Sequence, residues 1–173
     1  MTARLKFIAI LLIMAGSFAT CVDPVPELPA ETQTGANTFG CLVNGELVIP
    51  YPEHYSNKPH AVYDQTTDSL RIIGYGQNNQ VFKLTMKQPK ANLPATIDKV
   101  VYYPPNSPPG NFYYGGNNIG EITLTQFDLS KRVVSGIFHF VGHKRNAVTG
   151  ELIAPNEAVT VSLGRFDITI TNY

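Results

Sequence analysis

Hydrophobic and polar residues alternate along most of this chain, and that alternation limits its fold more than any other feature. From Asn37 onward the pattern has a period of two and is punctuated by turn residues, with no helical window of ten or more residues. Successive side chains of a β-strand point to opposite faces, so this pattern predicts half-buried strands. The inward-facing sets that it predicts are Phe82, Leu84 and Met86; Ile122 and Leu124; Val134, Phe138 and Phe140; Phe166, Ile168 and Ile170.

Turn residues predict how these strands pair. Asn44-Gly45 lies between two short apolar runs, and a two-residue hairpin there would place Leu42 opposite Leu47. A second hairpin is expected where the strands 61–64 and 70–75 flank a polar turn. About nine to ten strands with turn signals about 8–12 residues apart are typical of an all-β fold. We expect an antiparallel β-sandwich or a partly open barrel.

One segment, 102–118, breaks the alternation. It contains four prolines and three glycines, which predict an irregular loop and not a strand. Tyrosine combines a flat apolar ring with a hydroxyl group, which suits stacking on sugar rings or contact with a partner protein. The alternative is that the aromatic rings only cover one end of the sandwich. The candidate ligand-binding residues are Tyr102, Tyr103, Phe112, Tyr113 and Tyr114.

Length and composition exclude several classes of protein. A chain of 173 residues suits one domain of ordinary size, which we expect to span residues 36–173. The 13 basic and 13 acidic residues lack the positive excess of a nucleic-acid-binding protein. Two cysteines are too few for a disulfide-dense scaffold or a four-thiolate zinc site.

The first 20 residues have the pattern of a secretory signal peptide. Two basic residues precede the apolar run 7–14, and small residues then lead to Cys21. A cysteine at this place resembles the lipobox of bacterial lipoproteins, although Phe18 and Thr20 differ from the usual residues. The resemblance implies that the chain is cut before Cys21 and that this residue is acylated. The alternative is a signal peptide cut elsewhere, which would leave Cys21 a plain thiol.

Residues 21–35 follow as a Pro-rich linker, which predicts a semi-rigid spacer. Without residues 1–20 the chain keeps 11 basic and 13 acidic residues, a net charge of −2. Charge would therefore not draw it to an anionic membrane. Two or three acyl chains hold a protein firmly in a bilayer, so the lipid on Cys21 is the expected membrane anchor.

Three motifs together resemble a family of small uncharacterised Bacteroidota lipoproteins. They are Thr-Phe-Gly-Cys-Leu-Val-Asn-Gly at 38–45, Leu-Thr-Gln-Phe-Asp-Leu-Ser-Lys-Arg-Val-Val-Ser-Gly-Ile-Phe-His-Phe at 124–140, and Gly-Arg-Phe-Asp-Ile at 164–168. The resemblance covers roughly residues 32–173. It implies an all-β protein of the cell envelope, and we expect it in the outer membrane, facing the periplasm or the exterior. It implies no activity, and the lipid-bearing cysteine is the one functional residue that it supplies.

The motifs that could carry catalysis or bind a metal all have plainer interpretations. His139 and His143 lie four residues apart, roughly 13 Å along a strand, which is too far for one metal ion. Glu121 has no evident carboxylate partner for the acid–base pair of a glycosidase. Arg165 and Asp167 share the outer face of the last strand and are expected to be paired surface charges. We predict no catalytic residue, cofactor or metal.

Two further residues have a predicted chemical state. Cys41 lies in a strand opposite Val48, and a buried, inert thiol is expected there. Asp68-Ser69-Leu70 resembles the three-residue O-glycosylation motif of Bacteroidota envelope proteins, which makes Ser69 a candidate acceptor. The overall expectation is a lipid-anchored envelope protein that acts by binding. The partners considered are the membrane, a glycan or peptide, and another envelope protein.

Overall fold

A computed structural model describes residues 27–50, 58–105, 111–115, 120–146, 149 and 151–172. Strands dominate these residues, and one 3₁₀ turn, η1 (Gln77–Asn79), interrupts them. None of the helical structure described here is long and apolar enough to span a membrane. The strands are β1 (Thr38–Val43), β2 (Glu46–Val48), β3 (His60–Asp64), β4 (Ser69–Tyr75), β5 (Val81–Lys87), β6 (Pro94–Thr96), β7 (Lys99–Tyr103), β8 (Asn111–Gly115), β9 (Gly120–Asp128), β10 (Val133–Asn146) and β11 (Leu152–Asn172).

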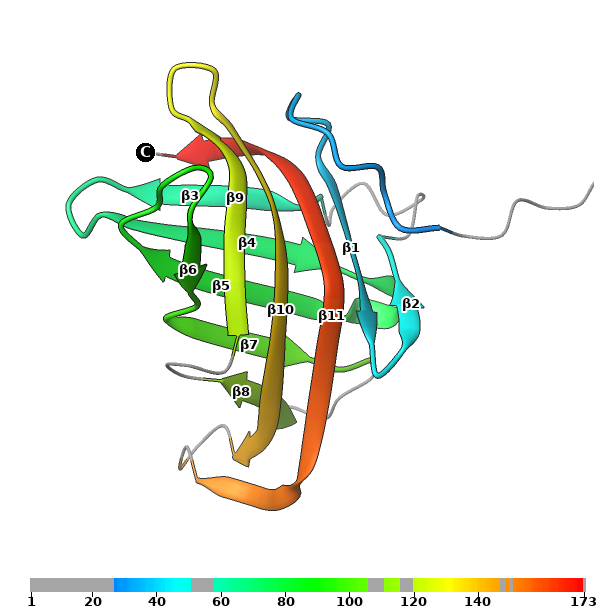
Figure 1. The fold of residues 1–173 in the computed structure, drawn as a ribbon. Coiled ribbons are helices and arrows are strands. Elements are labelled where there is room, and N and C mark those ends of the chain that lie inside the picture. The colour runs from blue at the N-terminus through cyan, green and yellow to red at the C-terminus, as the bar shows by residue number, and fades with distance from the viewer. Residues whose placement is uncertain are drawn as a thin grey trace, which may run out of the picture.

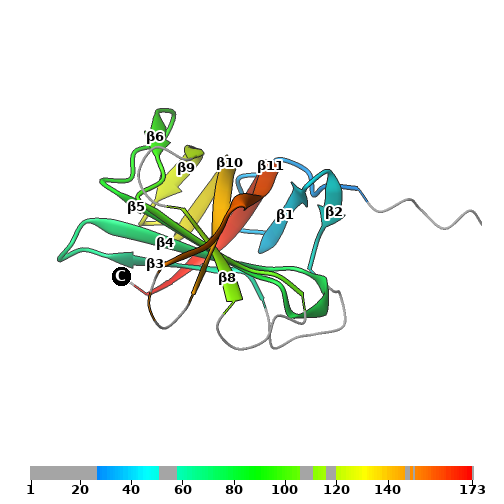
Figure 2. The same ribbon diagram turned by 90° about the horizontal axis from the view of Figure 1, so that it is seen from below.

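The strands form one hydrogen-bonded sheet that folds over into two layers. The first layer has the order β2-β1-β11-β10-β9-β6, and the second has the order β3-β4-β5-β7-β8. Figures 1 and 2 show the strands of the first layer crossing over those of the second. Two corners join the layers: the end of β11 pairs with β3, and the end of β10 pairs with β8. Such corners are typical of orthogonal sheet packing.

The predicted fold class is confirmed, with two differences in detail. Eleven strands occur among the described residues, where about nine to ten were expected. The pairing of β3 with β11 is parallel, whereas the other pairings between named strands are antiparallel. A parallel contact arises here because β11 is long enough to leave the first layer at its C-terminal end. The alternation of hydrophobic and polar residues does not show where a strand passes from one layer to the other, so it could not predict this corner.

The hydrophobic core lies between the two layers. Each of the inward-facing sets predicted from the alternation is buried, with side chains at most 3% exposed. Phe138 lies at the centre of an aromatic cluster: its ring centroid is 5.5 Å from that of Phe39 and 6.2 Å from that of Phe166. Phe39 in turn contacts Phe82 of the second layer, with 5.3 Å between centroids. This cluster joins the two layers through ring-to-ring packing.

The Asn44-Gly45 hairpin forms as predicted. Val43 pairs with Glu46, Leu42 with Leu47 and Cys41 with Val48. Asn44 and Gly45 have φ angles of 50° and 86°, the left-handed values that this tight turn requires. The turn is also fastened to β11, because the Asn44 side chain accepts a hydrogen bond from the Thr160 amide at 2.9 Å. A local signal in the sequence therefore fixes both a turn and its place in the sheet.

Candidate functional site

The aromatic segment forms strands where an irregular loop was expected. Residues 99–103 are β7 and residues 111–115 are β8, and the two pair with each other in antiparallel register. The prediction of a loop across 102–118 was wrong for these residues. The prolines at 104 and 105 follow the end of β7, so they do not interrupt its hydrogen bonds. Positions 106–110 and 116–119 lie outside the described residues.

Strand alternation divides the five candidate aromatic residues between the two faces of the sheet. Tyr102 is 2% exposed and stacks on Phe82, with 4.6 Å between ring centroids, while its hydroxyl accepts a hydrogen bond from Gln80. Tyr113, its cross-strand partner, also packs against the core. Tyr102 is therefore part of the interior, and Tyr113 is half-buried against it. Tyr102 is therefore not accessible to a ligand.

The other three rings, on Tyr103, Phe112 and Tyr114, lie on the outward face of the same strands. Tyr103 is 36% exposed, and Phe112 and Tyr114 are half-buried. The rings of Tyr103 and Phe112 are neighbours, with 6.0 Å between centroids. Tyr75 on β4 continues this surface, because it pairs with Val81, which pairs with Tyr103. We call the outward surface of β4, β5, β7 and β8 around Tyr75, Tyr103, Phe112 and Tyr114 the aromatic face.

Cations lie over the rings of the aromatic face. The Lys83 ammonium is 5.3 Å from the Tyr103 ring centroid, and the Lys99 ammonium is 5.9 Å from that of Tyr114. The guanidinium of Arg145 lies 5.3 Å from the Tyr114 ring. These distances are within the range of cation–π attraction. The aromatic face thus combines flat apolar rings with positive charge.

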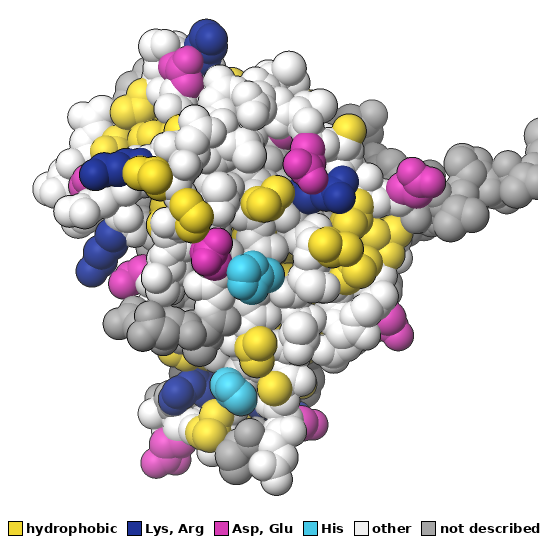
Figure 3. All heavy atoms as spheres, viewed as in Figure 1, with side chains coloured by type: hydrophobic (Ala, Val, Ile, Leu, Met, Phe, Trp, Pro, Cys, Tyr) yellow, Lys and Arg dark blue, Asp and Glu magenta, His cyan; other side chains and the backbone are white. Residues whose placement is uncertain are grey.

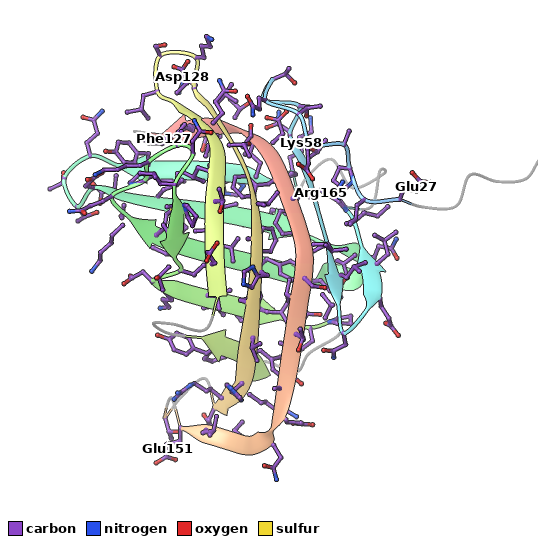
Figure 4. The ribbon with its side chains drawn as sticks, in the orientation of Figure 1. Glu27, Lys58, Phe127, Asp128, Glu151 and Arg165 are labelled. Carbon is purple, nitrogen blue, oxygen red and sulfur yellow. The ribbon has the colours of Figure 1, made fainter. Side chains whose placement is uncertain are left out.

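The first layer carries a separate hollow on its outer surface, over β9, β10 and β11. Its volume is about 200 Å³. Apolar, acidic and histidine side chains gather on this side of the molecule, and Arg165 lies on β11 next to the N-terminal segment (Figures 3 and 4). The residues around the hollow are Glu31, Glu121, Thr123, Ile137, Phe138, His139, Leu163, Gly164 and Arg165. The φ angle of Leu163 is 50°, which marks the irregularity in β11 that opens the hollow.

One ion pair lies beside this hollow. Arg165 Nε lies 3.3 Å from a carboxylate oxygen of Glu31, and Glu121 is the cross-strand neighbour of His139. Glu31 is therefore engaged by a cation, whereas a glycosidase needs a carboxyl that stays protonated and free to donate. Within the described ranges, no three His, Cys, Asp or Glu side chains are grouped as a metal site. The hollow thus offers polar and apolar groups for contact with a ligand.

Asp167 corrects one prediction, because it is buried and not a surface charge. It is 1% exposed and accepts six hydrogen bonds. Their donors are the hydroxyls of Thr32, Thr34 and Ser135 and the backbone amides of Thr34, Gly35 and Ala36. Burial alone raises the pKa of this carboxyl. The hydrogen bonds outweigh burial and hold its pKa well below the ordinary value of 3.8.

The N-terminal segment therefore docks on the outer surface of β11. Residues 32–36 wrap the Asp167 carboxylate, and Arg165 Nη1 donates to the Pro29 carbonyl at 3.4 Å. Arg165 also pairs with Glu31 of this segment, where a partner across the strands was expected. A lone aspartate among strand residues does not show that a distant segment will cover it. The only hint in the sequence is the run of small and hydroxyl residues in Thr-Gln-Thr-Gly-Ala at 32–36.

The remaining predicted residues differ in how far the structure describes them. Cys21 lies outside the described residues. Ser69 begins β4, and its hydroxyl is 2.8 Å from that of Thr67 in the exposed turn before it. Cys41 is fully buried, as expected, and burial raises the pKa of its thiol to about 12. A thiol with this pKa stays protonated and is a poor nucleophile at neutral pH.

Comparisons with known proteins do not assign a function to any of these sites. No protein-family model, no curated protein and no solved structure matches the chain. The candidate sites therefore rest on the chain's own residues: the aromatic face on the second layer, the hollow on the first layer, and the docked segment between Pro29 and Ala36.

Proposed function

We propose that this protein is a lipid-anchored component of a bacterial outer membrane and that it acts by binding, not by catalysis. The support for the anchor is the signal-like sequence that ends at Cys21. The support for binding is the aromatic face, where outward-facing rings lie side by side on paired strands. The resemblance to small Bacteroidota lipoproteins agrees with the anchor and implies no activity.

The single observation that carries the binding function is the outward placement of Tyr103, Phe112 and Tyr114 on paired strands. Tyrosine rings supply large contact areas and lose few rotatable bonds on binding. Flat, half-exposed rings match the apolar faces of sugar rings, and their hydroxyls offer hydrogen bonds at the edges. We therefore take a glycan as the ligand class. A peptide or protein partner is the alternative that binding experiments must separate from it.

The docked N-terminal segment sets how far this surface stands from the membrane. If Cys21 carries the lipid, Pro29, whose carbonyl is bound by Arg165, lies eight positions after it in the chain. At about 3.4 Å per residue, eight residues span at most about 27 Å. The proposed anchor therefore holds the domain close to the bilayer. The distance of the aromatic face from the membrane then depends on the domain and not on the linker.

Replacing Cys21 by alanine should release the protein from the membrane, because the acyl chains supply its membrane affinity. Fractionation of cells that express Cys21→Ala should find the protein in the soluble fraction, and a palmitate analogue should no longer label it. Cys41→Ala is the matched control: it removes the other cysteine and should leave location and labelling unchanged. A Cys21→Ala protein that stays membrane-bound and labelled would contradict the proposed anchor.

Replacing Tyr103 and Tyr114 by serine should weaken glycan binding by roughly 5- to 150-fold, because each ring contributes roughly 0.5–1.5 kcal/mol of contact. Affinity electrophoresis through gels that contain soluble polysaccharides measures this loss. The melting temperature should change little, since the two side chains lie on the outward face.

Ile137→Ser is the control for that double variant. Ile137 is 41% exposed, close to the exposure of Tyr103, but it lies on the opposite layer. It should leave binding unchanged. Equal binding by wild type, double variant and control would show that the aromatic face is not the binding surface. A double variant that melts far below the wild type would assign the rings to the core instead.

A further inference from the structure

Positive charge is concentrated on the aromatic face, although the chain as a whole is neutral. After residue 20 the acidic residues outnumber the basic ones, 13 to 11. Yet the strand register places Arg71, Lys83, Lys87 and Lys99 on the outward side of β4, β5 and β7, and all four are exposed. Among the described residues, Lys87 lies 3.9 Å from the Asp98 carboxylate, and the other three cations have no ion-pair partner. The aromatic face is thus a basic surface on a protein without basic excess.

The strand register sets rings and cations in the same or neighbouring rows. One row crosses the strands through Tyr75, Val81 and Tyr103, and the next passes through Ile73, Lys83 and Val101 to Tyr114. The third row contains Arg71, Thr85 and Lys99. Neighbouring strands lie about 4.8 Å apart, so four strands present a surface roughly 14 Å wide. Each sugar that lies on a ring would have a cation within reach in the next row.

We propose that the ligand of the aromatic face is an anionic polysaccharide whose sugars carry carboxylate groups. This inference rests on the proposed function and specifies its ligand. In the ligand-free protein the Lys83 and Lys99 ammonium groups lie over the Tyr103 and Tyr114 rings. Both lysines are exposed on flexible stems, so each can leave its ring and bind a sugar carboxylate while the sugar stacks on the ring. A neutral sugar would displace the same cations and offer no negative group to receive them.

A polysaccharide fits this surface better than an anionic membrane does. Membrane insertion needs protruding apolar side chains. Of the large hydrophobic side chains that the structure describes as exposed, Tyr103 alone belongs to the aromatic face, at 36%. The exposed aliphatic residues belong to other parts of the chain: Leu93, Ile137, Val141, Leu152, Ile153 and Leu163. Half-buried rings that do not protrude suit stacking better than membrane insertion.

Three polymers test the inference on the full-length protein. Polygalacturonate carries a carboxylate on each sugar, galactan has the same sugar ring without the charge, and poly-L-glutamate has the charge without the sugar. Affinity electrophoresis should show polygalacturonate binding at least about tenfold tighter than either of the others. Binding should also weaken as salt is raised, because the cations are exposed and are screened.

Two double variants, each lacking two lysine charges, test whether this preference depends on Lys83 and Lys99. Lys83→Gln/Lys99→Gln should bring polygalacturonate binding to within about threefold of galactan binding. Lys90→Gln/Lys131→Gln removes the same charge from two exposed lysines outside the strands of the aromatic face, and should keep the wild-type preference. Unchanged preference in the first pair would overturn the role of these two lysines.

The other outcomes separate this inference from the proposed function. Equal binding of galactan and polygalacturonate would overturn the anionic ligand and leave glycan binding in place. Equal binding of poly-L-glutamate and polygalacturonate would show recognition of charge alone, which overturns the inference. No binding to any polysaccharide would overturn both. Binding of the Cys21→Ala variant to vesicles of phosphatidylcholine and phosphatidylglycerol, without binding to polygalacturonate, would assign the surface to the membrane instead.

Discussion

Replacing Phe138 by alanine is expected to lower the free energy of unfolding by about 3–5 kcal/mol. Phe138 is 3% exposed and its ring contacts those of Phe39, Phe140 and Phe166. Gly164, its partner on β11, leaves the space that the ring fills, because a Cβ there would collide with it. The cluster cannot close around the missing ring without moving two layers of sheet. A cavity would therefore remain, which adds to the lost burial.

The adjacent residue provides the matched control for this measurement. Ile137 points to the opposite face of β10 and is 41% exposed, so Ile137→Ala should cost less than about 1 kcal/mol. Urea unfolding of both variants and the wild type gives the two differences directly. A loss below about 1 kcal/mol for Phe138→Ala, or a larger loss for Ile137→Ala, would mean that the inner and outer faces of β10 are reversed.

Features that depend on neighbouring residues were predictable from the sequence. The alternation of Phe82, Leu84 and Met86 identified the buried face of β5 because a strand has only two faces. The Asn44-Gly45 pair identified its hairpin and register because few other residues tolerate two consecutive left-handed conformations. Both signals act within a few residues, and neither requires knowledge of the rest of the fold.

The aromatic segment shows where such local signals mislead. The high proline and glycine content of 102–118 as a whole predicts a loop. It hides the short runs 99–103 and 111–115, which form β7 and β8. Pairing with β5 and β10 stabilises these strands, and those partners are distant in the sequence. The division of the tyrosines into buried and outward rings follows from that pairing. It could be derived only after the strands were known.

Contacts between segments that are distant in the chain also could not be predicted from the sequence. The docking of residues 32–36 on Asp167 joins positions more than 130 apart in the chain. The hollow beside Arg165 depends on the same docked segment, because Glu31 forms part of its wall. The charge pattern alone predicts that Asp167 is a surface residue, because nothing adjacent to it in the sequence indicates that another segment covers it.

Replacing Asp167 by asparagine is expected to lower the free energy of unfolding by about 2–4 kcal/mol at neutral pH. The carboxylate accepts six hydrogen bonds, and an amide of the same size has one acceptor oxygen and an NH₂ group that would face donors. Residues 29–36 should then undock, so limited proteolysis should cut this segment faster in the variant. Asp128→Asn is the control. Asp128 also accepts hydrogen bonds from nearby residues, but it ends β9 at an exposed turn, so its replacement should destabilise the protein much less than that of Asp167.

The cost of Asp167→Asn should shrink as the solution becomes acidic. The hydrogen bonds hold the folded-state pKa of Asp167 below its unfolded value of 3.8, so its contribution is complete above about pH 5 and is lost as pH falls toward the folded pKa. Between pH 5 and pH 3 the difference between wild type and variant should decrease by about 1 kcal/mol, because the unfolded carboxyl becomes protonated first. Urea unfolding of both proteins at these two pH values measures the change. A difference that stays constant, or grows at low pH, would show that the Asp167 carboxylate does not hold the segment through its charge.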